Sequence, residues 1–439
     1  MNPPSTDPHI DLAARSQAAF ELAKQGRALE AERAYADLLR DAPAHVEALN
    51  FLAIRAHARG DRAEALRLLE QARGADAKDL ITRVNLGVLH REQGKLEEAF
   101  EALSMCMEVP PAESFVPRLR LAEVLQSLGR HQEALPTYFG AIWAAQGRGQ
   151  WLDNATTPPE LRALVLHAMR YVEQGRRALF FSMLNPLRDR YGGTAVARVE
   201  KSLAIYLGDL TAHYPEPQQR PKFLYFPDLP APRFFDRELF PWYADLEAQT
   251  DAIRAEMLAA LGEDNGFEPF LGHFDDQRAL QDHLRGERGT PAWNALFFHR
   301  HGVRYEENAR RCPRTAAALD AAPLCRIRDH SPEACFSVLT PGSHILPHHG
   351  VTNTRIVTHL PLVVPDDCAL VVGGELHRWE EGTCFSFDDT FEHEAWNRSG
   401  DTRVVMLLDA WNPYLTEVEQ LALTDLIGAI GDFNRAAGV

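Results

Sequence analysis

Residues 336–409 read FSVLTPGSHILPHHGVTNTRIVTHLPLVVPDDCALVVGGELHRWEEGTCFSFDDTFEHEAWNRSGDTRVVMLLD. Short runs rich in β-branched and aromatic residues alternate there with turns of Pro, Gly and Asp. This alternation is typical of a compact β sandwich or barrel. The expected strands lie near residues 334–340, 355–364, 368–373, 383–387 and 403–409.

Two histidines in similar settings lie between those runs: His348 in Pro-His-His-Gly and His393 in Phe-Glu-His-Glu. Arg403 opens the apolar run 404–408. Two imidazoles brought together on a β scaffold suit a divalent metal such as Fe(II), and a nearby arginine suits a carboxylate held by two parallel hydrogen bonds. The alternative is a β domain whose histidines are only structural or solvated, which is the commoner role of a single imidazole.

Several short motifs occur in a fixed order over this stretch. They are Phe336-Ser337, Pro341-Gly342, Pro347-His348, Thr352-Asn353, His359-Leu360, Trp379-Glu380-Glu381-Gly382, Phe387-Asp388-Asp389, Phe391-Glu392-His393-Glu394 and Arg403. Together they resemble the catalytic domain of the aspartyl/asparaginyl β-hydroxylase family, which are Fe(II)- and 2-oxoglutarate-dependent oxygenases. The resemblance begins near Phe223 and covers roughly the C-terminal half.

The resemblance implies a metal site with two protein ligands, His348 and His393. In the commoner iron triad a carboxylate follows the first histidine by two residues. Gly350 stands at that place here, and the family resembled likewise has glycine there, with water filling the vacancy. Asp389 matches a family aspartate close to the metal-bound water, and we expect it to orient that water. His349 is expected to point to the opposite face of its strand.

The same resemblance implies how 2-oxoglutarate is held. Arg403 is predicted to bind its C5 carboxylate as a two-pronged donor, which lysine cannot copy, and Ser337 matches a hydroxyl that shares this carboxylate. His359 matches a histidine near the C1 carboxylate. The better-known animal member has an arginine where this chain has Val357. Arg355 lies on the same strand face as His359 and is the alternative cation.

Length and charge limit the function. A chain of 439 residues favours two domains. The net charge of −16 argues against nucleic acid or an anionic membrane surface as the main partner. No apolar run approaches the roughly 20 residues of a membrane span, and no signal peptide precedes the six cysteines, which are expected to be free thiols. We therefore expect a soluble, cytoplasmic protein.

The N-terminal half contains a repeat of 34 to 35 residues. The repeat is marked by four glycines, Gly26, Gly60, Gly94 and Gly129. Each glycine is followed four and five residues later by Glu-Ala. A small residue lies seven residues before each glycine: Ala19, Ala53, Gly87 and Ala122. This period and pattern match tetratricopeptide repeats, in which each unit is a helix pair and stacking supplies the core. The glycine is expected to end the first helix with positive φ, and the small residue to sit where paired helices approach closely.

The remaining segments are interpreted relative to the repeats and to the β-rich stretch 336–409. Residues 150–210 are expected to be degenerate or capping helices, and the Pro-rich segment 214–221 is the expected linker. The predicted domains are an all-α tetratricopeptide solenoid at 10–213, with clear repeats to about 145, and a double-stranded β-helix (jelly roll) with flanking helices at 222–439. The flanking helices are expected at 241–261, 304–320 and 416–433, the last opened by a capping box at Thr416 and Glu419.

The expected function is oxidative hydroxylation with Fe(II) and 2-oxoglutarate, on Asp or Asn of a peptide or protein that the repeats dock. One alternative is a small molecule or a lipid acyl chain as substrate, since the family resembled includes enzymes of that kind. Another is a non-catalytic scaffold with a relic oxygenase domain. The presence of both histidines and Arg403 favours an enzyme over a relic.

Overall fold

The computed structural model describes residues 8–263, 266–272, 282–286 and 292–439. By contacts, the chain forms two compact units. The first contains the residues up to Arg176 together with 433–439, and the second contains 177–432. The division therefore falls ahead of the domain boundary expected at 214–221, and the separate folding of 10–213 and 222–439 stays a prediction.

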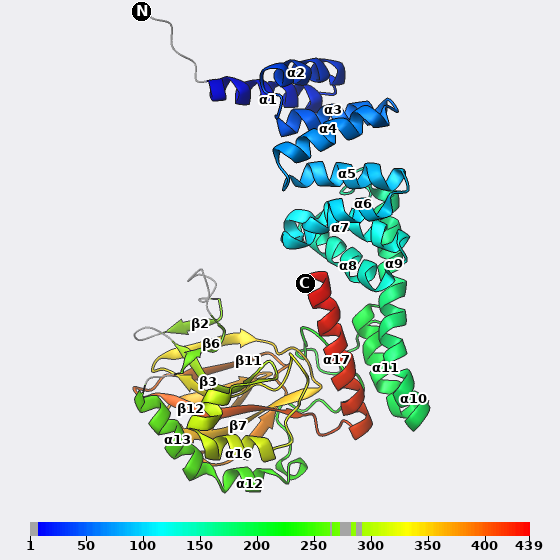
Figure 1. Ribbon diagram of the computed structural model, residues 1–439. Coiled ribbons are helices and arrows are strands. Elements are labelled where there is room, and N and C mark those ends of the chain that lie inside the picture. The colour runs from blue at the N-terminus through cyan, green and yellow to red at the C-terminus, as the bar shows by residue number, and fades with distance from the viewer. Residues whose placement is uncertain (1–7, 264–265, 273–281, 287–291) are drawn as a thin grey trace, which may run out of the picture. The chain divides into compact units, whose positions relative to one another are not determined.

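The first unit is a stack of helix pairs (Figure 1). Its elements are α1 (Pro8–Lys24), α2 (Ala28–Asp41), α3 (Val46–Ala58), α4 (Arg62–Ala75), α5 (Leu80–Glu92), α6 (Leu96–Ser104), the 3-10 helix η1 (Met105–Glu108), α7 (Pro111–Ser127) and α8 (His131–Gly147). The predicted pairs are confirmed, because each of the four repeat glycines lies between the two helices of a pair with φ from 73° to 83°. An L side chain is strained in that region, so glycine ends the helix cheaply.

Close approach between the helices explains the small residues of the repeat. A Cβ placed on Gly87 would lie 2.5 Å from Leu103 Cγ, on the second helix of the same pair. Ala19, Ala53 and Ala122 are fully buried at the equivalent positions. Interiors packed at this density have no room for a larger group without a shift of the helices.

The segment 150–210, expected to be capping helices, is helical only from Arg162 onward. It forms α9 (Arg162–Met183), α10 (Asn185–Tyr191) and α11 (Gly193–Leu207). Helix α11 belongs to the second unit, where Ser202 donates a hydrogen bond to the Tyr225 carbonyl and Arg198 pairs with Glu419 at 2.7 Å. The second unit thus includes helices that the sequence assigned to the solenoid. No described helix is both long and apolar enough to cross a membrane.

The second unit contains two antiparallel sheets (Figure 1). The larger sheet has the order β1-β3-β5-β12-β7-β10, with β4 paired to β3, and the smaller has the order β2-β6-β11-β8-β9. The strands are β1 (Glu268–Pro269), β2 (Leu284–Gly286), β3 (Trp293–Arg300), β4 (Val303–Arg304), β5 (Ala334–Leu339), β6 (Ser343–His348), β7 (Arg355–Val363), β8 (Cys368–Val372), β9 (Glu375–His377), β10 (Phe385–Phe387), β11 (His393–Asn397) and β12 (Arg403–Trp411). The predicted antiparallel β region is confirmed, whereas its jelly-roll connectivity stays a prediction.

Side chains that alternate along the central strands pack into two separate hydrophobic cores. Val405 and Leu407 of β12 pack with residues of the smaller sheet, whereas Val404, Met406 and Leu408 pack with the flanking helices. Successive strand residues point to opposite faces, so one strand serves both cores. The helical elements of this unit are α10, α11, η2 (Arg237–Leu239), α12 (Tyr243–Glu247), α13 (Thr250–Glu263), α15 (Glu306–Arg311), α16 (Pro313–Ala321) and α17 (Glu417–Ala437).

The flanking helices lie where they were predicted, but two of them are interrupted. The helix expected at 241–261 is two helices, and the one expected at 304–320 breaks ahead of Pro313, which cannot continue a helical hydrogen-bond ladder. The capping box at α17 is confirmed, because the Thr416 amide donates to Glu419 Oε2 and the Glu419 amide donates to Thr416 Oγ1. All six cysteines are free, as predicted, and the structure shows that all six are buried.

The Pro-rich segment 214–221, the expected linker, is mostly exposed or half-buried, but it is bonded to later loops of the second unit. Gln219 is 1% exposed and donates through Nε2 to Asp388 Oδ2 at 2.7 Å. The amides of Arg220 and Lys222 donate to the carbonyls of Thr390 and Gly350. Prolines prevent a helix but leave the backbone extended, and an extended backbone can pair with a neighbouring loop. The segment therefore bonds to the loop that precedes β11, and Lys222, just after it, bonds to the loop that follows β6.

Candidate metal and cosubstrate site

The two predicted ligand histidines meet across a pair of strands. His348 ends β6, His393 begins β11, and the two are Cα partners in the antiparallel register. Their ring centroids are 4.0 Å apart. Each Nδ1 bonds to a carbonyl two residues earlier, of Leu346 at 2.8 Å and of Phe391 at 3.0 Å. A carbonyl only accepts, so each Nδ1 carries the proton and each Nε2 keeps its lone pair for a metal.

Burial makes both imidazoles neutral at physiological pH. It lowers the pKa of His348 to about 4, with a smaller contribution from His393, and it lowers the pKa of His393 to about 4. Removal from water disfavours the charged form of an imidazole. Two neutral imidazoles with fixed tautomers are a donor set that suits a divalent transition metal.

Asp389 occupies the space beside Gly350. A Cβ on Gly350 would lie 2.2 Å from Asp389 Cγ, and the Gly350 amide donates to the Asp389 carbonyl at 2.7 Å. A carboxylate at position 350 therefore has no room. Asp389 Oδ1 is buried and has no hydrogen-bond partner among the described residues. The described part of the chain contains no cluster of three metal-ligating side chains. The two Nε2 lone pairs and the unpartnered Asp389 oxygen are the donors that a metal and a water bound to it would meet here.

A cavity of about 160 Å³ lies between the sheets and joins these groups. Its polar lining contains every predicted site residue: Ser337, His348, Arg355, His359, Asp389, His393 and Arg403. Its apolar lining includes Phe270, Trp293, Ile345, Val357, Leu370 and Leu407. Residues far apart in the sequence converge because β5, β6, β7, β11 and β12 each present inward-facing side chains there.

Arg403 is a buried cation that has no counter-charge among the described residues. It is 2% exposed, its Nε has no hydrogen-bond partner among the described residues, and no described carboxylate pairs with it. Its Nη1 lies 3.5 Å from Ser337 Oγ, which also accepts from Trp293 Nε1 at 3.0 Å. Burial lowers the pKa of Arg403 to about 10, so the side chain stays charged at neutral pH. A buried charge of this kind is costly without an anionic partner, which an anionic ligand would supply.

His359 is held in one tautomer by an indole. Trp379 Nε1 donates to His359 Nδ1 at 3.1 Å. Indole only donates, so Nδ1 of His359 is unprotonated and its proton lies on Nε2. Burial, reinforced by the charge of Arg403, holds the pKa of His359 well below its usual range. The ring is therefore a neutral donor at the cavity wall, suited to an anionic oxygen.

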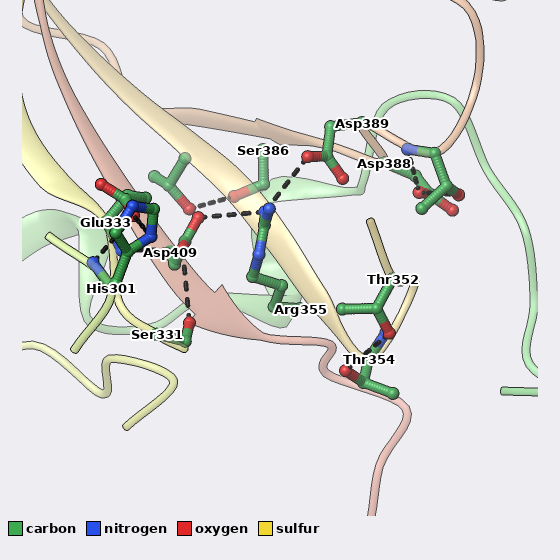
Figure 2. A network of polar contacts seen from close by, with 12 residues as sticks. His301, Ser331, Glu333, Thr352, Thr354, Arg355, Ser386, Asp388, Asp389 and Asp409 are labelled. Carbon is green, nitrogen blue, oxygen red and sulfur yellow. Dashed lines mark hydrogen bonds and ion pairs between the residues drawn. The ribbon is translucent and has the colours of Figure 1, made fainter. Parts of the chain in front are cut away.

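Arg355 bridges two carboxylates, as Figure 2 shows. Its Nη1 lies 3.1 Å from Asp389 Oδ2 and 3.1 Å from Asp409 Oδ1. Burial alone would lower the pKa of Arg355, but the charges of Asp389 and Asp409 raise it above its ordinary value. Arg355 thus lines the predicted pocket, and its charge is already engaged there.

Comparison with known proteins identifies the family of the chain. The family model described as aspartyl/asparaginyl beta-hydroxylase matches residues 247–413. Aspartate beta-hydroxylase domain-containing protein 2 of Mus musculus is 32% identical over 262 residues, which span 59% of this chain and 73% of that protein. The chain belongs to the aspartyl/asparaginyl β-hydroxylase family. The predicted resemblance is confirmed.

Two further relatives in the aspartyl/asparaginyl β-hydroxylase family carry different names. The ornithine lipid ester-linked acyl 2-hydroxylase of Rhizobium tropici is 34% identical over 185 residues, which span 42% of this chain and 61% of that protein. The aspartyl/asparaginyl beta-hydroxylase of Homo sapiens is 32% identical over 182 residues, which span 40% of this chain and 22% of that protein. Family membership alone thus leaves the substrate open.

Sequence reasoning assigned no role in this site to Asp409 and did not place the indole of Trp379. Asp409 ends the apolar run of β12, and a single acid after five apolar residues was the available signal. Trp379 belongs to a family motif, but its bond to His359 depends on the fold. Asp388, the neighbour of Asp389, is a turn anchor, because its Oδ1 accepts from the amide and hydroxyl of Thr390. His349 bonds to the Thr390 carbonyl.

Proposed function

We propose that the protein is an Fe(II)- and 2-oxoglutarate-dependent hydroxylase. One observation carries the proposal: two neutral imidazoles, both with Nε2 available, share a small cavity with a buried arginine that has no counter-charge among the described residues. A metal cation would bind the two imidazoles, and a dicarboxylate would supply the anionic partner of the buried arginine. A relic domain under no catalytic demand has no reason to keep an uncompensated buried cation, which argues against the scaffold alternative.

The chain's own residues would divide the work. His348 and His393 would hold the metal. Arg403 and the Ser337 hydroxyl would hold one carboxylate of 2-oxoglutarate, and the Nε2 proton of His359 would donate to the other. Fe(II) with O2 supplies the oxidising chemistry, in which a substrate C–H becomes C–OH while 2-oxoglutarate becomes succinate and CO2. The apolar walls would exclude bulk water from the reacting carbon.

The substrate that we favour is Asp or Asn of a peptide or protein. The family model and the relatives named for aspartate support this class, and a repeat unit of stacked helices is a common peptide-docking surface. The second candidate is a lipid acyl chain. The Rhizobium tropici relative and the largely apolar lining of the cavity favour it.

The test separates the two candidates. Full-length protein with Fe(II), 2-oxoglutarate and O2 is incubated either with Asp- and Asn-containing peptides or with acyl-chain substrates, and the product is analysed by mass spectrometry. Addition of one oxygen to a peptide, coupled to equimolar succinate, supports the first class, and addition to an acyl chain supports the second. The His348→Ala protein is the control for metal-independent oxidation. Failure of Mn(II) and 2-oxoglutarate to bind under anaerobic conditions would overturn the proposal itself.

A further inference from the structure

Asp409 is fixed from two sides by backbone and hydroxyl groups. Its Oδ2 accepts from the Glu333 amide at 2.8 Å and from Ser331 Oγ at 3.3 Å, while its Oδ1 faces Arg355. Asp409 is 1% exposed. A carboxylate held by a backbone amide cannot turn without losing a buried hydrogen bond, so the position of Asp409 is set by β12 and the residues before β5.

Arg355 transmits this fixed position to Asp389. Its Nη1 contacts Oδ1 of Asp409 and Oδ2 of Asp389 at the same distance, 3.1 Å (Figure 2). Asp389 is thereby held on one side by Arg355 and on the other by its packing on Gly350. Only Oδ1 of Asp389 is left without a partner among the described residues. The three side chains form a continuous link from the sheet backbone to the edge of the metal site.

The charge of this cluster matters as much as its geometry. Two carboxylates share one guanidinium, which leaves one excess negative charge beside the two histidines. That excess attracts a metal cation and repels a carboxylate of the cosubstrate. Arg355 lies on the same strand face as His359 and could reach the cosubstrate from there. The excess negative charge nevertheless makes Arg355 poorly suited to bind 2-oxoglutarate directly.

We propose that Arg355 and Asp409 are positioning residues that hold the Asp389 carboxylate beside Gly350, with Oδ1 available to a water on the metal. The inference rests on the proposed function for its metal, and it assigns Arg355 to the metal side of the site. It also predicts that Arg355, Asp409 and Asp389 act as one unit, so that their effects on metal affinity are not additive.

The test uses full-length variants and two separate titrations under anaerobic conditions. Mn(II) is titrated by calorimetry without cosubstrate, and 2-oxoglutarate is then titrated at saturating Mn(II). Asp409→Asn and Arg355→Gln are each expected to weaken Mn(II) by about 10- to 100-fold, the loss typical of an outer partner of a metal site. Arg355→Gln leaves the cluster more negative, so tighter Mn(II) binding in that variant would show that the cluster acts through its charge and would overturn the positioning role. The 2-oxoglutarate affinity at saturating Mn(II) should change by less than about threefold, because Arg355 does not touch the cosubstrate.

Conservative and combined variants show whether the effect is positional. Arg355→Lys keeps the charge and should recover part of the Mn(II) affinity. In the Asp389→Asn protein, the added Asp409→Asn substitution should weaken Mn(II) affinity by less than about a further twofold. Both substitutions act on Mn(II) through the Asp389 carboxylate, so their effects are not additive. Asp409→Asn is nearly isosteric, so it keeps the test open if Arg355→Gln does not fold. The matched control is Glu419→Gln, which breaks the Arg198 ion pair of the same unit and should leave both affinities unchanged.

Two further outcomes overturn the inference. If Arg355→Gln weakens 2-oxoglutarate more than about tenfold at saturating Mn(II) while Mn(II) affinity is unchanged, Arg355 is a direct cosubstrate ligand. If Asp409→Asn and Arg355→Gln change neither affinity, the network is only structural. Both results differ from a failure of the proposed function, in which the unsubstituted protein itself binds neither Mn(II) nor 2-oxoglutarate.

Discussion

Replacement of Arg403 tests the cosubstrate site most directly. Its guanidinium is buried, lies 5.1 Å from the centre of the Trp379 ring and faces no described carboxylate. If it binds the 2-oxoglutarate carboxylate, Arg403→Lys keeps the charge but loses the planar fork. The loss of a charge-assisted hydrogen bond is worth about 1.5–3 kcal/mol, which is about 10- to 160-fold in Kd.

Arg403→Ala should be more severe than Arg403→Lys. It leaves the buried carboxylate of the ligand unpaired, a defect that costs about 3–5 kcal/mol in comparable buried pairs. That cost corresponds to about 150- to 5,000-fold in Kd. Arg403→Met should leave the cosubstrate-free protein at least as resistant to heat as the parent, because it removes a buried cation that has no described counter-charge.

The assay is titration of 2-oxoglutarate into each variant under anaerobic conditions with Mn(II) present. Since burial lowers the pKa of Arg403 only to about 10, the parent affinity should be flat between about pH 6.5 and 8.5. Arg254→Lys, which changes a surface pair with Asp251 and Glu381, is the matched control. Unchanged affinity in Arg403→Ala would refute the assignment of Arg403 to the cosubstrate carboxylate. Loss of Mn(II) binding in Arg403→Ala would show that the residue supports the metal instead.

Four further predictions follow from the same geometry. His348→Ala and His393→Ala should each reduce Mn(II) affinity by more than about 100-fold in a folded protein, measured by calorimetry and circular dichroism, because a two-histidine site has no spare ligand. Gly350→Asp should not improve metal binding and should destabilise the fold by about 1–3 kcal/mol in urea unfolding, because its Cβ overlaps a neighbouring carboxylate. Trp379→Phe should weaken 2-oxoglutarate by about 2- to 12-fold, the worth of one neutral hydrogen bond, without changing Mn(II) affinity. A chain that begins at residue 222 should lose Mn(II) affinity relative to one that begins at residue 177, because it lacks Gln219 and Arg220, which bond to the loop before His393; equal affinities would contradict this.

Local sequence pattern determined the helical repeats and most strands. The glycine at each repeat needs positive φ, and the small residue at Gly87 meets Leu103 inside one helix pair, so both requirements act within about 35 residues. Strands such as β7 and β12 show as apolar runs because both of their faces are buried. The sequence also suggested candidate roles for His348, His393 and Arg403, since few side chains suit a metal or a carboxylate, and these roles stay predictions.

Tertiary structure alone decided how those residues meet. The sequence did not predict strands β6 and β11, because Pro347 and several polar residues interrupt their apolar pattern. It is the register of these two strands that places His348 opposite His393. The burial of Gln219 in a Pro-rich segment depends on loops more than 100 residues later. The pairing of Arg355 with Asp389 and Asp409 depends on which inward-facing side chains adjoining strands bring together. Periodicity reports only which face of an element is buried, whereas register and the pairing of buried charges are fixed by contacts between distant segments.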